Sequence, residues 1–154
     1  MSVLGKFRHK NGFNQLVKLL EISDAEKQTN LLRLVAQDDP GWARLAQIKM
    51  LTTDKVLGWP TDVLGGILAS LENHMIAALL QDSTLNIATN VKKSLAHRVL
   101  RDVQGLVERK HYDEQEKFAA RLKLVQTVRE MLQLGIIDLS QVAPSLVIDP
   151  RLIA

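Results

Sequence analysis

Residues 37–54 read QDDPGWARLAQIKMLTTD, and this stretch decides the fold class. Pro40 fits the first turn of a helix, with Asp39 as its N-cap, because proline lacks the backbone N–H that the first turn leaves unbonded. Apolar side chains then recur at helical spacing on one side, namely Trp42, Leu45, Ala46 and Ile48. Residues 52–54, Thr-Thr-Asp, form the next helix-start signal. The stretch therefore predicts short helices joined by few residues.

The same spacing continues towards the N-terminus. It predicts one helix with an inward apolar stripe and a second helix whose start carries a capping box made by Ser23 and Glu26. The two inward stripes are Phe13, Leu16, Val17 and Leu20, then Leu31, Leu34 and Val35. No run of four or more residues alternates as a half-buried strand does. The sequence therefore predicts an all-α protein.

Helical spacing also continues towards the C-terminus. After a break at residues 58–60, Gly-Trp-Pro, we expect Thr61 and Asp62 to cap the next helix. An apolar residue at every fourth position over residues 87–107 predicts one helix of about five turns. A last long helix follows, with Gly135 as its C-cap. We expect the apolar stretch from Ile136 to Ala154, which contains two prolines, to lie irregularly on the helical bundle, with one further short helix as the alternative.

Composition bounds the class of protein. The chain has 154 residues, 46% of them hydrophobic and 24% charged, which is typical of one globular domain or two small subdomains. The absence of cysteine excludes a disulfide framework and thiol chemistry. No apolar run reaches the roughly 18 residues of a membrane span, and the first residues lack the pattern of a signal peptide. We therefore expect a cytoplasmic location without membrane insertion.

No motif indicates catalysis, a cofactor or a bound metal. The four histidines are scattered and form none of the spacings typical of a metal site. Gly65 and Gly66 lie within a helical stripe, so we interpret them as a close helix contact rather than a phosphate cradle. The paired carboxylates lie in capping or solvated positions, where burial does not separate their pKa values. The sequence therefore predicts a protein that is not an enzyme.

Two kinds of charged surface remain as candidates. Residues 6–10 and Arg109 to Tyr112 are basic with an aromatic residue interleaved, which suits a nucleic-acid backbone but is also typical of a solvated loop or terminus. The polar face of residues 85–107 is either a solvated side or a charged ridge presented to a partner. The net charge of +3 by itself favours neither interpretation strongly.

The run from Gln37 to Asp54, followed by Val63 to Leu71, resembles the middle and C-terminal part of the FliG family of flagellar motor switch proteins. In that family a short helical repeat ends in an acidic-Pro step, continues to a Met-Phe-x-Phe hinge and enters a six-helix C-terminal subdomain. The resemblance covers about residues 12–139 and omits the family's N-terminal half. It implies a non-enzymatic rotor protein of flagellar motility and chemotaxis.

The resemblance also implies an organisation of the chain. Residues 12–49 would form an armadillo-like subdomain within a right-handed superhelix, residues 50–53 a hinge, residues 54–139 the C-terminal subdomain, and residues 140–154 a tail. The hinge falls on Met50, Leu51, Thr52 and Thr53. Both family phenylalanines are replaced there, so we expect the apolar anchoring of the hinge to be weaker.

The helix at 85–107 would correspond to the family's torque helix, whose charged ridge meets the stator. Arg98 falls on a family arginine, whereas Gln81 replaces a lysine, and Gly105 with Leu106 replaces two acidic residues. The partner-facing residues would be Lys92, Lys93, Arg98, Arg101 and Asp102. The family's alternation of charge is mostly missing, so these basic residues suit an acidic partner surface.

The resemblance implies other switch-complex proteins and the cytoplasmic loop of a stator as partners, with self-association by helix stacking. The location would be the cytoplasm, peripheral at the inner face of the membrane at the flagellar base. Two alternatives stay open, namely a helical adaptor that has kept this fold outside torque generation, and a basic nucleic-acid-binding domain. Nucleic-acid binding would weaken steeply with salt and depend on the loop from Arg109 to Tyr112.

Overall fold

The computed structural model describes residues 4–9 and 11–149, and this part of the chain is helical without any strand, as the sequence predicts. Lys10 and residues 150–154, which belong to the predicted basic run and tail, lie outside the described residues. The chain divides into two compact units. The first extends to Leu51 and resumes at Leu139, and the second runs from Thr52 to Asp138.

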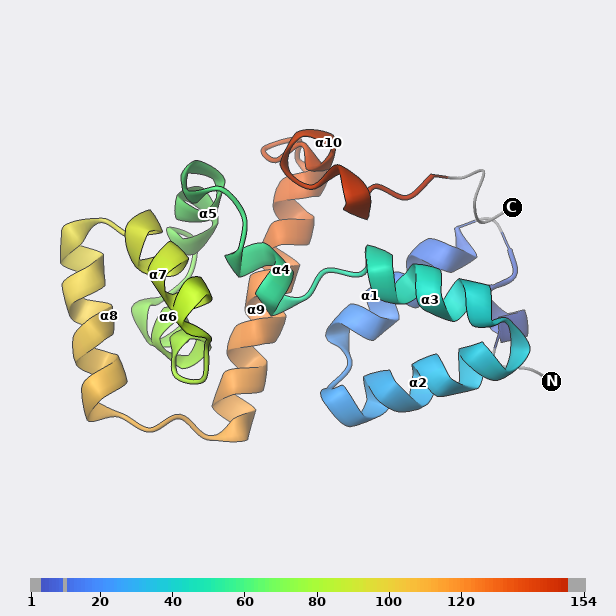
Figure 1. Cartoon of the computed structure of the whole chain (residues 1–154), viewed down its shortest axis with the longest axis horizontal. Helices are drawn as coiled ribbons and strands as arrows, with labels where there is room; N and C mark the ends of the chain where they lie inside the picture. The colour runs from blue at the N-terminus through green and yellow to red at the C-terminus, as the bar shows by residue number, and fades with distance from the viewer. Residues whose placement is uncertain (1–3, 10, 150–154) are drawn as a thin grey trace. The chain divides into compact units, whose positions relative to one another are not determined.

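The first unit is built around three helices (Figure 1). Its elements are the 3₁₀ turn η1 (Leu4–Phe7), α1 (Gly12–Ile22), α2 (Ala25–Asp38), α3 (Pro40–Lys49), α10 (Leu139–Val142) and the 3₁₀ turn η2 (Pro144–Leu146). The predicted stripe of α1 is fully buried and packs against Val35, Trp42 and Ala46. The prediction that Ile48 faces inward is wrong, because this residue is 47% exposed.

The second unit contains α4 (Thr53–Leu57), α5 (Thr61–Leu68), α6 (Asn73–Leu80), α7 (Leu85–Ser94), α8 (His97–Arg109) and α9 (Glu114–Gln133). Five consecutive residues of α6 are buried, from Ile76 to Leu80. This helix packs against both α8 and α9, whereas α5 packs against α7 (Figure 1). This strongly apolar helix can lie between two others, because its apolar residues let it bury side chains on several sides.

The single five-turn helix predicted over residues 85–107 is wrong, because the chain breaks at Leu95 and Ala96 into α7 and α8. Both residues have extended backbones, with ψ values of 142° and 149°. No glycine or proline marks the break in the sequence. The two halves pack on different helices, α7 on α5 and α8 on α6. One straight helix could not bury its apolar residues against both of these partners.

Local helix signals are mostly correct. Asp39 and Thr52 cap α3 and α4 by accepting hydrogen bonds from the backbone N–H groups of Trp42 and Lys55. Gly135 has the positive φ of 76° expected of a C-terminal glycine. The prediction of a capping box at Ser23 is wrong. Asp24 caps α2 instead, and the Ser23 hydroxyl donates a hydrogen bond to the Leu19 carbonyl. The predicted cap at residues 61–62 is also wrong, since α5 begins after Pro60 without a side-chain cap.

The adjacent glycines of α5 differ in their surroundings. A Cβ atom on Gly65 would lie 3.0 Å from the Ser94 backbone oxygen, whereas one on Gly66 would have no atom within 4 Å. The predicted close helix contact therefore holds for Gly65, which lets the end of α7 approach α5. Gly66 has no such neighbour.

This difference predicts opposite effects of two substitutions. Gly65→Ala should lower the free energy of unfolding by about 1–2 kcal/mol, because the backbone at Ser94 must move away. Gly66→Ala should raise it by up to about 1 kcal/mol, because alanine is the better helix former and no contact opposes it. Urea denaturation of both variants tests the pair, and equal shifts of the same sign would contradict it.

Candidate functional site

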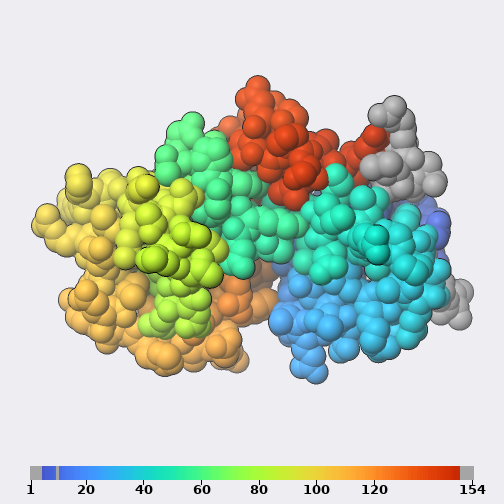
Figure 2. Space-filling view, in the orientation of Figure 1, coloured from blue at the N-terminus to red at the C-terminus, as the bar shows by residue number. Residues whose placement is uncertain are grey.

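The surface of α8 is strongly two-sided. Val103 is buried in the contact with α6, and the neighbouring apolar residues of α8 are partly buried. The opposite face is open to solvent, and the yellow to light-orange surface of α8 forms part of the exterior of its unit (Figure 2). A helix held by one face alone leaves the other available for a partner.

Positive charge is concentrated on α7 and α8. Six lysines and arginines and two acidic residues fall within residues 92–111, so this segment carries a net charge of +4 while the rest of the chain carries −1. The predicted partner-facing residues are all exposed, namely Lys92, Lys93, Arg98, Arg101 and Asp102. In the described part of the chain, no ion pair involves any of these five. Their charges are therefore not neutralised by neighbouring side chains.

Gly105 is half-buried in α8 and lies four residues after Arg101 and four residues before Arg109, both of which are exposed. The Arg109 Nη2 atom lies 3.2 Å from the point that a Cβ atom on Gly105 would occupy. The sequence pattern predicts Arg109 in a separate basic loop, whereas the structure places it in the last turn of α8, two turns after Arg101. The spacing of these residues by four could have indicated their common face.

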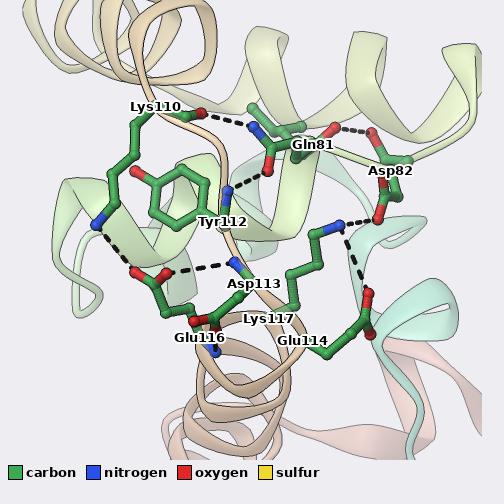
Figure 3. Close-up of polar contacts among 10 residues, drawn as sticks. Gln81, Asp82, Lys110, Tyr112, Asp113, Glu114, Glu116 and Lys117 are labelled. Atoms are coloured by element: carbon green, nitrogen blue, oxygen red, sulfur yellow. Dashed lines mark hydrogen bonds and ion pairs between the residues drawn. The ribbon is translucent and has the colours of Figure 1, made fainter.

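Gln81 binds the loop between α8 and α9 (Figure 3). The family that the sequence resembles has a lysine at this position. The side-chain amide of Gln81 donates to the Lys110 carbonyl at 2.7 Å and accepts from the Tyr112 N–H at 2.7 Å. Tyr112 is 1% exposed, and the Lys110 ammonium lies 4.8 Å from the centre of its ring. Gln81 therefore has a structural role in fixing this loop. The Tyr112 hydroxyl is buried with no hydrogen-bond partner.

The basic residues of this loop and of α9 are partly neutralised, in contrast to those of α8. Lys110 forms an ion pair with Glu116 at 2.9 Å, and Glu116 also completes a capping box with Asp113. The buried Lys117 ammonium forms ion pairs with Asp82 and Glu114 (Figure 3). A cavity of about 100 Å³ beside Lys117 is lined by Asp54, Asp82, Lys117 and Arg121 among others. The formal charges of these four lining residues cancel.

These pairs predict a loss of stability in acid. The hydrogen bond from Lys117 lowers the pKa of Asp82, and the hydrogen bond from Lys110 lowers the pKa of Glu116. Carboxyl groups whose pKa is lowered by folding stabilise the protein above their unfolded pKa of about 4, and this contribution is lost as the pH falls through the folded pKa. The urea concentration at the midpoint of unfolding should therefore decrease as the pH is lowered from 5 to 2. In Asp82→Asn this decrease should be smaller. An equally steep fall in Asp82→Asn would contradict this prediction.

The four predicted hinge residues lie at the boundary between the two units. Met50 and Leu51 are buried in the first unit, with 5% and 2% exposure. Thr52 caps α4, and Thr53 is the first residue of that helix. The chain also passes between the units a second time, after Asp138. Any rotation of one unit relative to the other would have to be accommodated at both connections.

In residues 4–9 and 11–149, no group of three or more potential ligands is placed to hold a metal ion. Over the same residues, no helix combines the length and the apolar character needed to cross a membrane. No protein-family model matches the chain, and a comparison with curated proteins gives no match.

Proposed function

We propose that this chain is a non-enzymatic protein-interaction module that presents the basic face of α7 and α8 to an acidic surface of a partner protein. One observation carries this proposal, namely that the excess positive charge of the chain lies on exposed side chains of these two helices, which form no ion pair with any residue that the structure describes. Complementary charge accelerates encounter and selects partners, although each exposed pair contributes little to affinity.

We further propose that the module acts as a FliG-like component of a flagellar motor switch. The resemblance of residues 12–139 supports this role, as does the boundary between the units, which falls within the expected hinge. The first unit would then supply an armadillo-like stack and the second the six-helix subdomain. Its partners would be other switch proteins or a stator loop, and its location the cytoplasm at the flagellar base.

The test is deletion of the gene in the source organism, with swimming and filament assembly scored. Complementation would use the wild-type chain, an Arg98→Glu/Arg101→Glu variant and the charge-matched control Lys18→Glu/Lys123→Glu, whose two positions are also exposed. We expect the deletion to stop swimming, the control to restore it, and the α8 variant to fail while remaining folded.

Two results would contradict the proposal. Normal swimming without the gene would favour a helical adaptor outside torque generation. Binding of single-stranded DNA that weakens steeply with salt and requires Arg109 to Tyr112 would favour a nucleic-acid-binding domain.

A further inference from the structure

We propose that residues 139–149 form a strap that locks the predicted hinge between the two units, by docking on the first unit after the chain has passed through the second. The strap consists of α10, η2 and the residues that follow them. While it is docked, the second unit, which carries α7 and α8, can rotate about one axis only. This inference goes beyond the proposed function, because it does not depend on which partner binds the basic face.

The strap docks on α3. The ammonium group of Lys49, in the last turn of α3, donates a 2.6 Å hydrogen bond to the carbonyl of Ser145, which lies 96 residues later in the chain. Ile148 packs against the hydrophobic core of the first unit. Leu146 is 6% exposed and belongs to η2, which contacts α3. The first unit is therefore completed by a segment that follows the second unit in sequence.

The internal structure of the strap depends on short-range hydrogen bonds. The Ala143 N–H donates to the Leu139 carbonyl at 2.8 Å, and the Leu146 N–H donates to the Ala143 carbonyl at 2.9 Å. No residue of α10 is buried, so the deeply buried anchor of the strap is Leu146. A segment with little buried apolar surface can open at a low free energy while the rest of the fold stays intact.

The chain crosses between the units at two places, between residues 51 and 52 and between residues 138 and 139. The first crossing is tied to α1, because the Leu51 N–H donates a 2.6 Å hydrogen bond to Glu21. Beside the second crossing, Ile137 is 8% exposed and belongs to the second unit. Neither crossing therefore contains a long flexible linker.

The number of fixed crossings determines how freely one unit can rotate. A body joined to another at one point can turn about three axes, whereas a body joined at two points can turn only about the line through them. The docked strap supplies the second fixed point. When the strap leaves α3, it moves with the second unit, and the crossing at residues 51 and 52 becomes the single connection that is still fixed.

Double electron–electron resonance on the full chain tests this lock, with spin labels at Lys18→Cys in the first unit and Lys123→Cys in the second. Both positions are exposed, and the chain has no other cysteine. Leu146→Asp buries a carboxylate at the anchor and should release the strap. We expect the distribution of distances between the labels to become about twofold wider or more.

Val147→Asp is the matched control, because it adds the same charge at the adjacent residue, which is 39% exposed. It should leave the width of the distribution unchanged. Amide hydrogen exchange reports docking directly. In Leu146→Asp the amides of the strap should exchange about tenfold faster or more, whereas those of α6 and α9 should not change. Ile148→Asp removes the second apolar anchor and provides the same test if Leu146→Asp does not fold.

Three results would overturn the proposal. The first is faster exchange of the strap without a wider distance distribution. The second is equal widening in Leu146→Asp and Val147→Asp. The third is strap exchange in the unsubstituted chain that is already as fast as in Leu146→Asp.

The strap and the proposed function can fail separately. If releasing the strap does not widen the distances but deletion of the gene stops swimming, the strap is wrong and the motor role stands. If the distances widen as expected but the deletion strain swims normally, the strap stands and the motor role is wrong.

Discussion

Gly12→Ala should lower the free energy of unfolding by about 3 kcal/mol, one of the two largest effects we expect from a single substitution. A Cβ atom on Gly12 would lie 1.6 Å from the carbonyl oxygen of Phe7 and 2.5 Å from its carbonyl carbon. Both are backbone atoms, so no change of rotamer can relieve the overlap. The turn η1 would have to move away from α1, which breaks the 2.8 Å hydrogen bond from the Gly12 N–H to the His9 carbonyl.

Chemical denaturation measures this effect, and two controls test its cause. Asn14→Ala, at an exposed position of the same helix, should change stability by no more than about 0.5 kcal/mol. In a chain that lacks residues 1–9, Gly12→Ala should cost nothing, because the overlapping carbonyl is gone. A large cost that persists in the shortened chain would show that the overlap with Phe7 is not the cause.

Glu21→Ala should lower the free energy of unfolding by about 2–3 kcal/mol, because it leaves a buried backbone N–H without its acceptor. Glu21 is only 8% exposed, and its carboxylate accepts a 2.6 Å hydrogen bond from the N–H of Leu51. Leu51 is itself 2% exposed and is the last residue of the first unit before the chain crosses to the second. The contact therefore anchors one end of the predicted hinge to α1.

Glu21→Gln is the matched variant, since it keeps an oxygen acceptor of similar size and removes the charge. It should cost about 1 kcal/mol, because a hydrogen bond to a neutral acceptor is weaker than one to a carboxylate. Amide hydrogen exchange at Leu51 should accelerate strongly in Glu21→Ala and less in Glu21→Gln. Unchanged exchange at Leu51 in both variants would contradict an anchoring role for this bond.

Part of the candidate site could be predicted from sequence. The exposed basic residues of α7 and α8 follow from the periodicity of apolar residues, because that pattern assigns the polar residues to the opposite face. The pattern predicts a loop at Arg109 although this residue ends α8, because the end of a helix without glycine or proline gives no local signal. The role of Gln81 could not be predicted, because its partners lie 29 and 31 residues away in the chain.

The all-α class, the buried stripe of α1 and the helix ends at Asp39, Thr52 and Gly135 could all be predicted from the sequence. These features depend on residues within about four positions of one another, where propensity, capping and periodicity act. The break at Leu95 and Ala96, in contrast, depends on contacts between helices and could not be predicted. The continuous apolar stripe is compatible with one helix, and the separate contacts of α7 with α5 and of α8 with α6 select two. Contacts between distant residues override local preference there, because they bury apolar surface that a single helix would leave exposed.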